Sequence, residues 1–146
     1  PRAELLLFAA SRAQHVDELI RPKLEQGHVV ICDRFLDSTA VYQGIARAID
    51  GDTVEAINKI AIASTLPDIT VLIDLDPEEG FRRIQSRNTE PPDRMEQEHM
   101  DFYKAVRQGY LDLAARNTDR FLVIDGQQSI DEVELAIWNG IKERVN

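Results

Sequence analysis

The apolar positions at the start of the chain recur at alternating steps of three and four residues, the spacing that places side chains on one face of a helix. This pattern predicts a long helix from Pro1 to Gly27. Pro22 should kink or break it near the end, because proline lacks an amide hydrogen, and Gly27 is a plausible stop. The predicted buried stripe consists of Leu6, Ala9, Ala13, Val16 and Ile20.

Three short apolar runs lack the alternation of a half-exposed strand, and continuous runs of this kind are typical of strands buried on both faces. The runs are Val29 to Cys32, Ile69 to Ile73 and Phe121 to Ile124. The segments around them predict helices from Asp37 onward, from Asp52 to Leu66, from Pro77 to about Arg87, from Glu96 to Asn117, and from Ser129 to the end.

Strands that alternate with helices predict a parallel sheet covered by helices on both faces. The predicted fold class is therefore a three-layer α/β domain, and residues 1–146 show no linker or repeat that would divide it. Three strands are few, since a sheet usually has about five or six. The sequence thus predicts that one or more N-terminal strands of the sheet are missing from this chain.

Polar residues mark where several of the predicted helices should begin. Asp37 offers an N-cap for the helix that follows the first apolar run. Asp52 with Glu55, and Ser129 with Glu132, have the spacing of a capping box, in which two side chains satisfy amides of the first turn.

The first apolar run ends in a charged pair, Asp33 and Arg34. In an open α/β sheet, ligands bind beyond the carboxyl ends of the strands, which is where this pair is expected. A charged pair on a rigid strand, beside the start of a new helix, suits an anion such as a phosphate. The dipeptide alone is not specific, because Asp93-Arg94 and Asp119-Arg120 repeat it.

Other side chains near this pair are candidates for contact with a ligand. Phe8 and Arg12 are neighbours on the first helix. Considered alone, this pair is better explained by a Phe8 ring in the core and an Arg12 charge in solvent. The helix after the pair carries two adjacent strips of polar or aromatic groups. A solvated face is the default interpretation of those strips, and their position makes a binding role at least as plausible. Their members are Ser38, Thr39, Tyr42 and Gln43.

A proline-containing segment, residues 88–94, separates two predicted helices and should not itself stay helical. A basic loop of this kind is a candidate lid over phosphates. An exposed turn whose arginines offset neighbouring acids is an equally good interpretation from composition alone. The flanking arginines are Arg82, Arg83, Arg87 and Arg94.

The composition narrows the class of protein. With 17 basic and 26 acidic residues the net charge is −9, which argues against a nucleic-acid partner because such partners select basic surfaces. No apolar run approaches the ~20 residues of a membrane span, and no signal peptide precedes the first helix. The single cysteine, Cys32, excludes a disulfide framework and favours a reducing compartment. A cytoplasmic protein without a membrane partner is expected.

Four blocks of the sequence resemble the thymidylate kinase family, a branch of the nucleoside monophosphate kinases, in its bacterial form. They are Glu4 to His15, Val30 to Gly44, Asp74 to Pro77, and the segment from Arg87 through Glu98. The resemblance extends from the first predicted helix to the last. It implies the fold of the P-loop nucleoside monophosphate kinases, with ATP and Mg²⁺ used to phosphorylate dTMP to dTDP.

The resemblance also implies roles for the candidate residues. Phe8 would stack on the thymine ring, and Arg12 would hydrogen-bond a base oxygen. Arg34 would hold the acceptor phosphate, with Asp33 beside it near the magnesium ion or its waters.

On the following helix, Ser38 and Thr39 would approach the base. Tyr42 would pack by the sugar and disfavour a 2′-hydroxyl, and Gln43 is a weaker candidate for the same pocket. The lid, at about residues 87–95, would bring in Arg87 and Arg94 to stabilise charge on the transferring phosphoryl group.

One motif of the family is absent, the Gly-x-x-x-x-Gly-Lys-[Ser/Thr] loop that cradles the donor phosphates. The family carries it on the first strand, upstream of the helix that opens this chain. The sequence is therefore interpreted as the C-terminal portion of a thymidylate kinase. This portion is expected to be inactive by itself. Two alternatives stay open: a related deoxynucleotide kinase with another base preference, and a non-catalytic nucleotide-binding or dimerisation module that lost its phosphate loop.

The resemblance further implies a homodimer. The helices predicted at residues 1–27 and 52–66 could form its contact, and the small residues Ala9 and Ala13 would let the helices approach closely.

Overall fold

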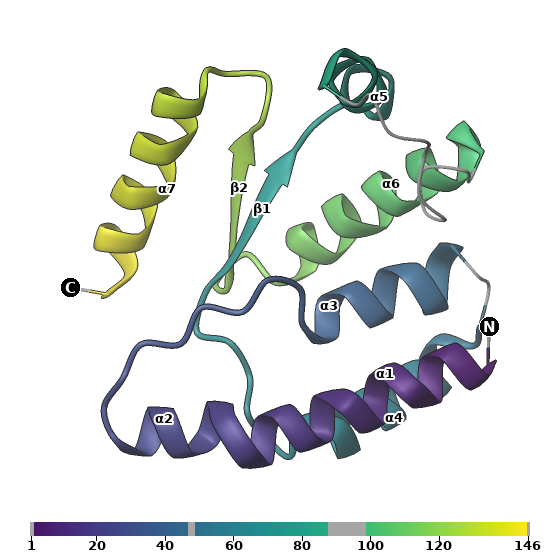
Figure 1. The fold of residues 1–146 in the computed structure, drawn as a ribbon, viewed down its shortest axis with the longest axis vertical. Helices are drawn as coiled ribbons and strands as arrows, with labels where there is room; N and C mark the ends of the chain where they lie inside the picture. Colours follow the sequence, from purple (N-terminus) through teal and green to yellow (C-terminus); the bar gives the residue numbers. More distant parts are fainter. Residues whose placement is uncertain (1, 47–48, 88–98, 146) are drawn as a thin grey trace. The chain divides into compact units, whose positions relative to one another are not determined.

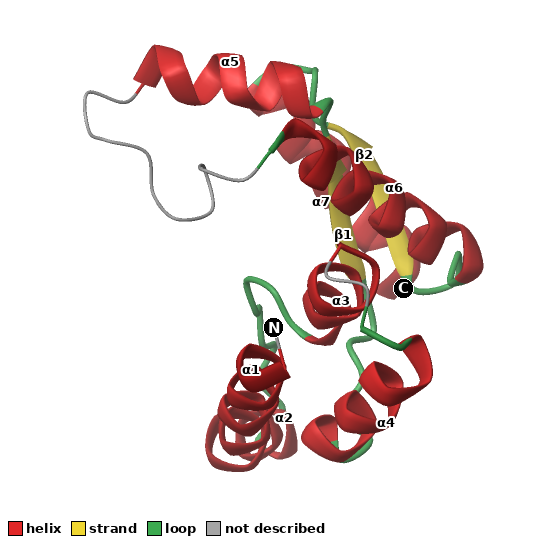
Figure 2. Cartoon of the chain, turned by 90° about the vertical axis from the view of Figure 1, so that its right-hand side faces the viewer, coloured by secondary structure: helices red, strands yellow, loops and turns green. Residues whose placement is uncertain are grey.

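The computed structural model describes residues 2–46, 49–87 and 99–145 (Figure 1). The chain divides into two compact units, Pro1–Leu66 and Pro67–Asn146, which we call the N-terminal unit and the C-terminal unit. In the described residues, the N-terminal unit is built from helices, whereas the C-terminal unit contains two strands with helices around them (Figure 2).

The predicted first helix is present as three consecutive helical segments. They are α1 (Arg2–His15), the π-helical η1 (Val16–Ile20) and α2 (Arg21–Glu25). Pro22 lies in the first turn of α2, directly after the π-helical segment. Because proline has no N–H to donate, the regular α-helical hydrogen bonding is interrupted where the sequence predicts a kink.

The predicted stop at Gly27 is confirmed. Gly27 has a φ of +78°, a left-handed conformation that glycine adopts without strain. Its N–H donates to the carbonyl of Leu24 at 2.9 Å, and the N–H of His28 donates to the carbonyl of Lys23 at 3.0 Å. These two bonds make a Schellman motif, which satisfies the last carbonyls of α2.

The buried stripe of this helix differs from the prediction at Leu6 and at Ala13, of which the second is half-buried. Leu5 is 2% exposed, whereas Leu6 is 52% exposed. Both residues have a helical spacing to the buried Ala9, four and three positions away, so spacing alone could not choose between them. Helix α1 packs against α4 (Gly51–Ile62), and in the structure it is Leu5 that is buried. The predicted burial of Val16 and Ile20 is correct.

The apolar run from Val29 to Cys32 is not a strand in the structure. Val29 and Ile31 are 89% and 94% exposed. The sheet in the described part of the chain has two strands, and neither comes from this run. A strand is stable only when a neighbour satisfies its backbone groups, so an apolar run without a paired neighbour stays irregular. The prediction of a third strand is therefore wrong for the described residues.

The helix after the Asp33-Arg34 pair begins as α3 (Leu36–Thr39) and continues as the π-helical η2 (Ala40–Ala46). The predicted N-cap is wrong, because Phe35 occupies the cap position and Asp37 lies inside the first turn, 7% exposed. A carboxylate is favourable at either place, since both lie near the positive end of the helix dipole.

Helix α4 begins one residue earlier than predicted, and its cap is Asp50. The Asp50 carboxylate accepts hydrogen bonds from the backbone N–H and the hydroxyl of Thr53, at 2.9 and 2.7 Å. The predicted capping box is therefore wrong, and Glu55 pairs instead with Lys59 at 2.7 Å. The helix ends at Ile62 rather than Leu66, because Ala63 adopts a left-handed conformation with a φ of +44°.

Two predicted strands are confirmed in the C-terminal unit. Strands β1 (Thr70–Asp74) and β2 (Phe121–Asp125) are parallel, with Thr70 opposite Phe121 and Asp74 opposite Asp125. Their carboxyl ends therefore meet at one edge, where each strand finishes in an aspartate.

Helices cover both faces of this strand pair, as predicted (Figure 1). Helix α6 (Met100–Arg116) packs on one face, with Val106 and Gly109 buried. Helix α7 (Ile130–Val145) packs on the other, where a Cβ at Gly140 would lie 2.5 Å from Leu122. Helix α5 (Pro77–Arg87) follows β1 and contacts α6.

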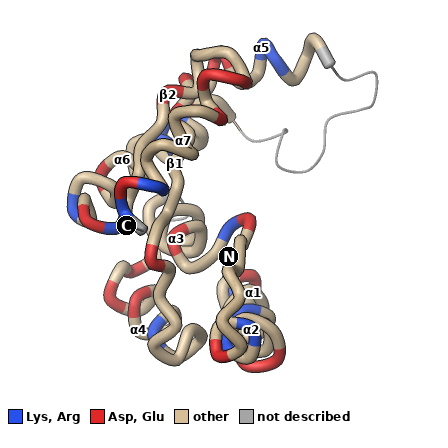
Figure 3. The backbone as a smooth tube through the Cα atoms, turned by 90° about the vertical axis from the view of Figure 1, so that its left-hand side faces the viewer, with Lys and Arg blue, Asp and Glu red and all other residues tan. Residues whose placement is uncertain are grey.

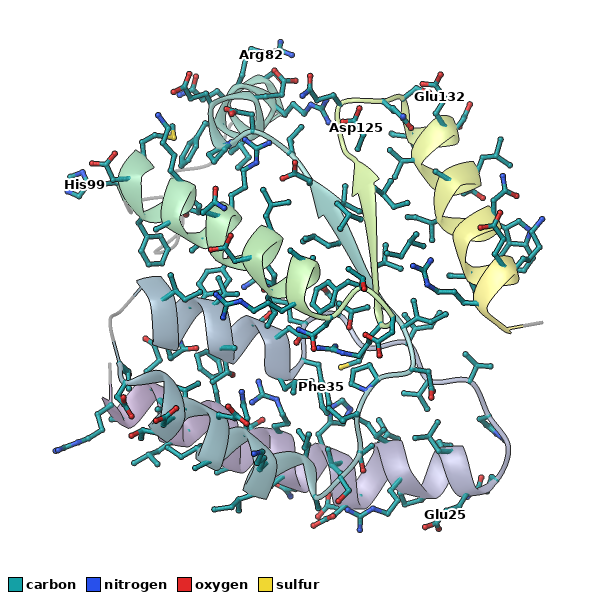
Figure 4. The ribbon with its side chains drawn as sticks, turned by 180° about the vertical axis from the view of Figure 1, so that it is seen from behind. Glu25, Phe35, Arg82, His99, Asp125 and Glu132 are labelled. Atoms are coloured by element: carbon teal, nitrogen blue, oxygen red, sulfur yellow. The ribbon has the colours of Figure 1, made fainter. Side chains whose placement is uncertain are left out.

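The predicted capping box of α7 is confirmed. Glu132 accepts hydrogen bonds from the N–H and the hydroxyl of Ser129, at 2.9 and 2.7 Å. Glu132 and Asp125 lie at the same end of the C-terminal unit, where β2 finishes and α7 begins (Figure 4). Ile130, the first residue of α7, is 78% exposed.

Acidic and basic positions are interspersed along α1, α2 and α4 rather than segregated by sign (Figure 3). None of the helices within the described ranges combines the length and the apolar character that crossing a membrane requires.

Candidate functional site

The N-terminal unit brings three helices together around the guanidinium of Arg12. The Nη2 atom donates to the carbonyl of Phe35 at 3.1 Å and to the hydroxyl of Thr39 at 2.8 Å. The Nη1 atom donates to Oδ1 of Asn58 at 3.1 Å. Arg12 comes from α1, Thr39 from α3 and Asn58 from α4, so the side chain links all three elements.

Arg12 is half-buried, in contrast to the solvated charge that its sequence neighbourhood alone suggests. Its guanidinium carbon lies 5.6 Å from the centre of the Phe35 ring, a distance at which the ring quadrupole attracts a cation. Burial lowers the pKa of Arg12, whereas the negative charges of an ionised Cys32 and of the Asp37 carboxylate act in the opposite direction. An arginine stays protonated in either case.

Phe8 is not the buried core ring that its sequence neighbourhood alone suggests. It lies four residues before Arg12 on α1 and is 52% exposed. An exposed ring beside a fixed guanidinium offers an apolar face and hydrogen-bond donors to the same ligand.

The strips on α3 and η2 are more buried than a solvated face would be. Thr39 is 2% exposed and Gln43 is 4% exposed. The amide of Gln43 donates to Oε1 of Glu4 on α1 at 2.9 Å. Ser38 and Tyr42 keep partial exposure. Thr39 and Gln43 therefore hold the two helices together, while Ser38 and Tyr42 present atoms to solvent.

The charged pair lies on the exposed turn before α3. Arg34 has a φ of +63°, a left-handed conformation that side-chain-bearing residues rarely adopt. Its guanidinium lies 5.1 Å from the centre of the Tyr42 ring. Asp33 is exposed. The thiol of Cys32 donates to the carbonyl of Arg34 at 3.3 Å, and burial raises the pKa of that thiol while Arg12 offsets part of the effect.

Of the two arginines assigned to the lid, the structure describes the position of one. Arg87 is the last residue of α5, in the C-terminal unit. Arg94, like the rest of the predicted lid from residue 88 onward, lies outside the described residues.

Sequence reasoning missed two contributors to these contacts, Asn58 and Glu4. Asn58 occupies the face of α4 that carries the buried Val54 and Ala61, at spacings of four and three. A polar residue on an apolar helical face is the signal that could have identified it. Glu4 lies in the block from Glu4 to His15, but no local pattern indicates that it accepts a hydrogen bond from Gln43.

A second charged cluster lies at the carboxyl end of β1. Arg107 on α6 donates to both carboxylate oxygens of Asp74, at 2.7 and 2.9 Å, and to Asp76 at 3.0 Å. These bonds hold the pKa of Asp74 below its usual range. The cluster borders a cavity of about 270 Å³ between β1, α5 and α6, whose walls are mostly apolar. The Asp74–Pro77 block of the sequence contains both carboxylates, but nothing in it indicates Arg107.

A comparison with protein families decides how these sites are interpreted. The family model described as thymidylate kinase matches residues 1–137, almost the whole chain. The chain belongs to the thymidylate kinase family.

Bacterial thymidylate kinases are close relatives of the chain. That of Syntrophotalea carbinolica is 46% identical over 142 residues, and that of Solidesulfovibrio magneticus is 49% identical over 142 residues. Each alignment covers 94% of this chain, and they cover 66% and 68% of the relatives.

A solved thymidylate kinase shares the fold. The crystal structure of the enzyme from Ehrlichia chaffeensis matches with a TM-score of 0.75 and 35% identity, over 96% of this chain and 64% of that chain. The fold is thus the α/β fold of the P-loop nucleoside monophosphate kinases, as the sequence predicts. This chain spans about two thirds of the length of the thymidylate kinases that it matches.

Proposed function

We propose that the protein carrying this chain transfers the γ-phosphoryl group of ATP to dTMP, giving dTDP and ADP. The observation that carries the proposal is the convergence within the N-terminal unit of the residues assigned to the acceptor nucleotide. Arg12 is bonded to Thr39 at the end of α3, and Arg34 lies over Tyr42 on η2, three residues further along the chain. Family membership supports the same reaction.

The acceptor phosphate is held by Arg34. Its guanidinium is exposed, and its planar fork can donate two parallel hydrogen bonds to phosphate oxygens. The Tyr42 ring beneath it limits the directions in which the guanidinium can point. Tyr42 is therefore also placed to pack against the sugar and disfavour a 2′-hydroxyl.

The base is held between Phe8 and Arg12. The exposed ring of Phe8 offers a stacking surface, and a remaining N–H of Arg12 donates to a base oxygen. Ser38 approaches the base from α3, whereas the buried Thr39 supports Arg12 and Gln43 supports the helix through Glu4.

Phosphoryl transfer forms a bond between an acceptor phosphate oxygen and the γ-phosphorus while the bond to the β-phosphate oxygen breaks. Catalysis of this step is mostly positioning and neutralisation of charge. The resemblance to the family assigns the neutralising charge to Arg87 and Arg94. The sequence contains no phosphate loop, so no residue of this chain is assigned to the donor phosphates.

The described residues fit a weakly held Mg²⁺ rather than a protein-enclosed one. They contain no group of three or more histidine, cysteine, aspartate or glutamate side chains that could surround a metal ion. Mg²⁺ commonly uses one or two carboxylates and completes its shell with water and substrate phosphates. The exposed carboxylate of Asp33 would hold it, directly or through water, and the ion would neutralise charge on the phosphates.

We also propose that the protein is a cytoplasmic homodimer. Large apolar side chains remain exposed on two neighbouring helices, with Leu7 on α1 at 71% and Ile60 on α4 at 80%. Ala9, by contrast, is buried within the unit, so the predicted role of this residue in the contact between protomers is wrong.

A panel of acceptors tests the proposed reaction. ADP formation by the full-length protein should be fastest with dTMP and slow with dCMP, dGMP and UMP. A preference for dCMP or dGMP would favour a related kinase. Failure to phosphorylate any of them in the presence of ATP and Mg²⁺ would favour a non-catalytic module.

A further inference from the structure

The buried amide of Asn58 connects Arg12 to the turn that begins α3. Its Oδ1 atom accepts from Nη1 of Arg12 at 3.1 Å, and its Nδ2 atom donates to the carbonyl of Leu36 at 3.2 Å. A guanidinium can only donate and a carbonyl can only accept, so one orientation of the amide satisfies both partners. Asn58 is 5% exposed, which leaves it almost no surface for direct contact with a ligand.

The guanidinium of Arg12 is held from three directions. Phe35 and Thr39 together use both hydrogens of Nη2, and Asn58 uses one hydrogen of Nη1. Among the described residues, two N–H groups of Arg12 have no hydrogen-bond partner, those of Nε and the second on Nη1. Without Asn58 no hydrogen bond would hold Nη1, because the two remaining acceptors both bind Nη2. The Nη1 and Nε atoms of the guanidinium could then move relative to the fixed Nη2 atom.

We propose that Asn58 is a positioning residue for recognition of the nucleotide base. It fixes the plane of the Arg12 guanidinium and the start of α3 together, so that a donor of Arg12 points at an oxygen of the base. The inference rests on the proposed function, because it assigns the partner of Arg12 to the base of dTMP. Asn58 acts through Arg12 and does not touch the reacting atoms.

The effect of removing Asn58 should be specific to the acceptor nucleotide. In Asn58→Leu, which keeps the branched shape of the side chain and loses both hydrogen bonds, the KM for dTMP should rise on the order of tenfold. The KM for ATP should stay within about twofold, since no contact of Asn58 reaches a residue assigned to the donor. Both constants are measured with the full-length protein.

A double-mutant cycle separates positioning from a merely structural role. If Asn58 acts through Arg12, Arg12→Met with Asn58→Leu should raise the KM for dTMP no more than Arg12→Met alone. Additive effects on that KM would overturn the inference, as would an equal rise in both KM values. Val54→Ala is the matched control, because Val54 lies one turn away on α4, is 2% exposed and has an apolar side chain that cannot hydrogen-bond Arg12. It should lower Tm and leave both KM values unchanged.

A second variant keeps the test open if Asn58→Leu does not fold. Asn58→Asp retains an acceptor for Arg12 and loses only the donor to Leu36, so its KM for dTMP should stay within about threefold of wild type. A rise of about tenfold or more in this variant would overturn the inference. Wild-type protein that does not phosphorylate dTMP would refute the proposed function itself, which is a separate result.

Discussion

At the scale of single residues, Arg34 combines an unfavourable backbone with an exposed functional group. Its φ of +63° lies in the left-handed region, where a residue with a Cβ costs about 1 kcal/mol relative to glycine. Backbone strain of this kind persists where the surrounding structure or a ligand requires it. We propose that binding of the acceptor phosphate is this requirement.

Arg34→Gly should therefore separate stability from activity. The free energy of unfolding should be about 1 kcal/mol higher in Arg34→Gly than in Arg34→Ala, because only glycine relieves the backbone strain. Both variants should lose most of their kcat/KM for dTMP, since neither retains the guanidinium. Denaturant unfolding and steady-state kinetics measure the two effects, and a glycine variant less stable than the alanine variant would contradict the assignment of strain.

The site could be predicted from sequence only as far as the blocks that resemble the family specified it. The block from Val30 to Gly44 contains Arg34, Thr39 and Tyr42, so its residues were identified together. Asn58 and Arg107 lie 46 and 33 positions from their partners Arg12 and Asp74. A contact over that distance depends on how helices pack, and no local pattern encodes it.

At the scale of elements, packing of α7 against β2 depends on the absence of a side chain at Gly140. A Cβ there would lie 2.5 Å from Cδ2 and 2.7 Å from Cδ1 of Leu122, closer than atoms can approach without movement. By contrast, a Cβ at Gly51, at the start of α4, would meet nothing within 4 Å.

The two glycines should respond to alanine in opposite directions. Gly140→Ala should lower the free energy of unfolding by about 1–3 kcal/mol through overpacking. Gly51→Ala should raise it by about 0.4–1 kcal/mol, because alanine restricts the unfolded chain. Urea unfolding of each variant checks both values, and a neutral Gly140→Ala would show that α7 can shift away from the strand.

The ion pair between α6 and β1 should make stability depend on pH. The pKa of Asp74 is lower in the folded protein than in the unfolded chain, because Arg107 binds its carboxylate. The stabilisation is therefore complete above the ordinary pKa of aspartate and is lost as pH falls through the folded pKa.

Arg107→Met tests this dependence. Its Tm should lie below that of wild type at pH 7, and the difference should shrink below about pH 4, where protonation weakens the wild-type pair. Thermal unfolding followed by circular dichroism across this range measures the difference. A constant difference from pH 7 to pH 3 would mean that Arg107 stabilises α6 by packing alone.

Elements were predictable where local signals and packing agree. The strands near residues 70 and 121 and helix α7 combine apolar patterns with clear boundaries, and the structure confirms them. The run from Val29 to Cys32 has the same composition but no paired neighbour, so composition could not reveal that it stays irregular. The predicted helix starts were wrong where acidic residues cluster, as at Asp50 and Asp52, because either carboxylate can cap the first turn.

At the scale of the whole molecule, the exposed apolar residues of α1 and α4 form the basis for the proposed dimer. Helix α4 carries Asn58 on its buried face and Ile60, 80% exposed, on the opposite face. Ile60→Glu should convert the dimer into a monomer in sedimentation velocity at micromolar concentration.

A matched control for this change is Leu135→Glu. Leu135 is 59% exposed on α7, in the C-terminal unit, and the proposal gives it no role in the contact. This variant should remain dimeric. Wild-type protein that sediments as a monomer at the same concentration would refute the proposed dimer.

The most direct test of the account is to follow phosphorus from donor to acceptor. The full-length protein is mixed with ATP, Mg²⁺ and dTMP, and ³¹P nuclear magnetic resonance identifies the products. The account predicts dTDP and ADP in equal amounts, with little inorganic phosphate, because the nucleotide held by Phe8, Arg12 and Arg34 is the acceptor. Release of inorganic phosphate without dTDP, or no consumption of ATP, would contradict it.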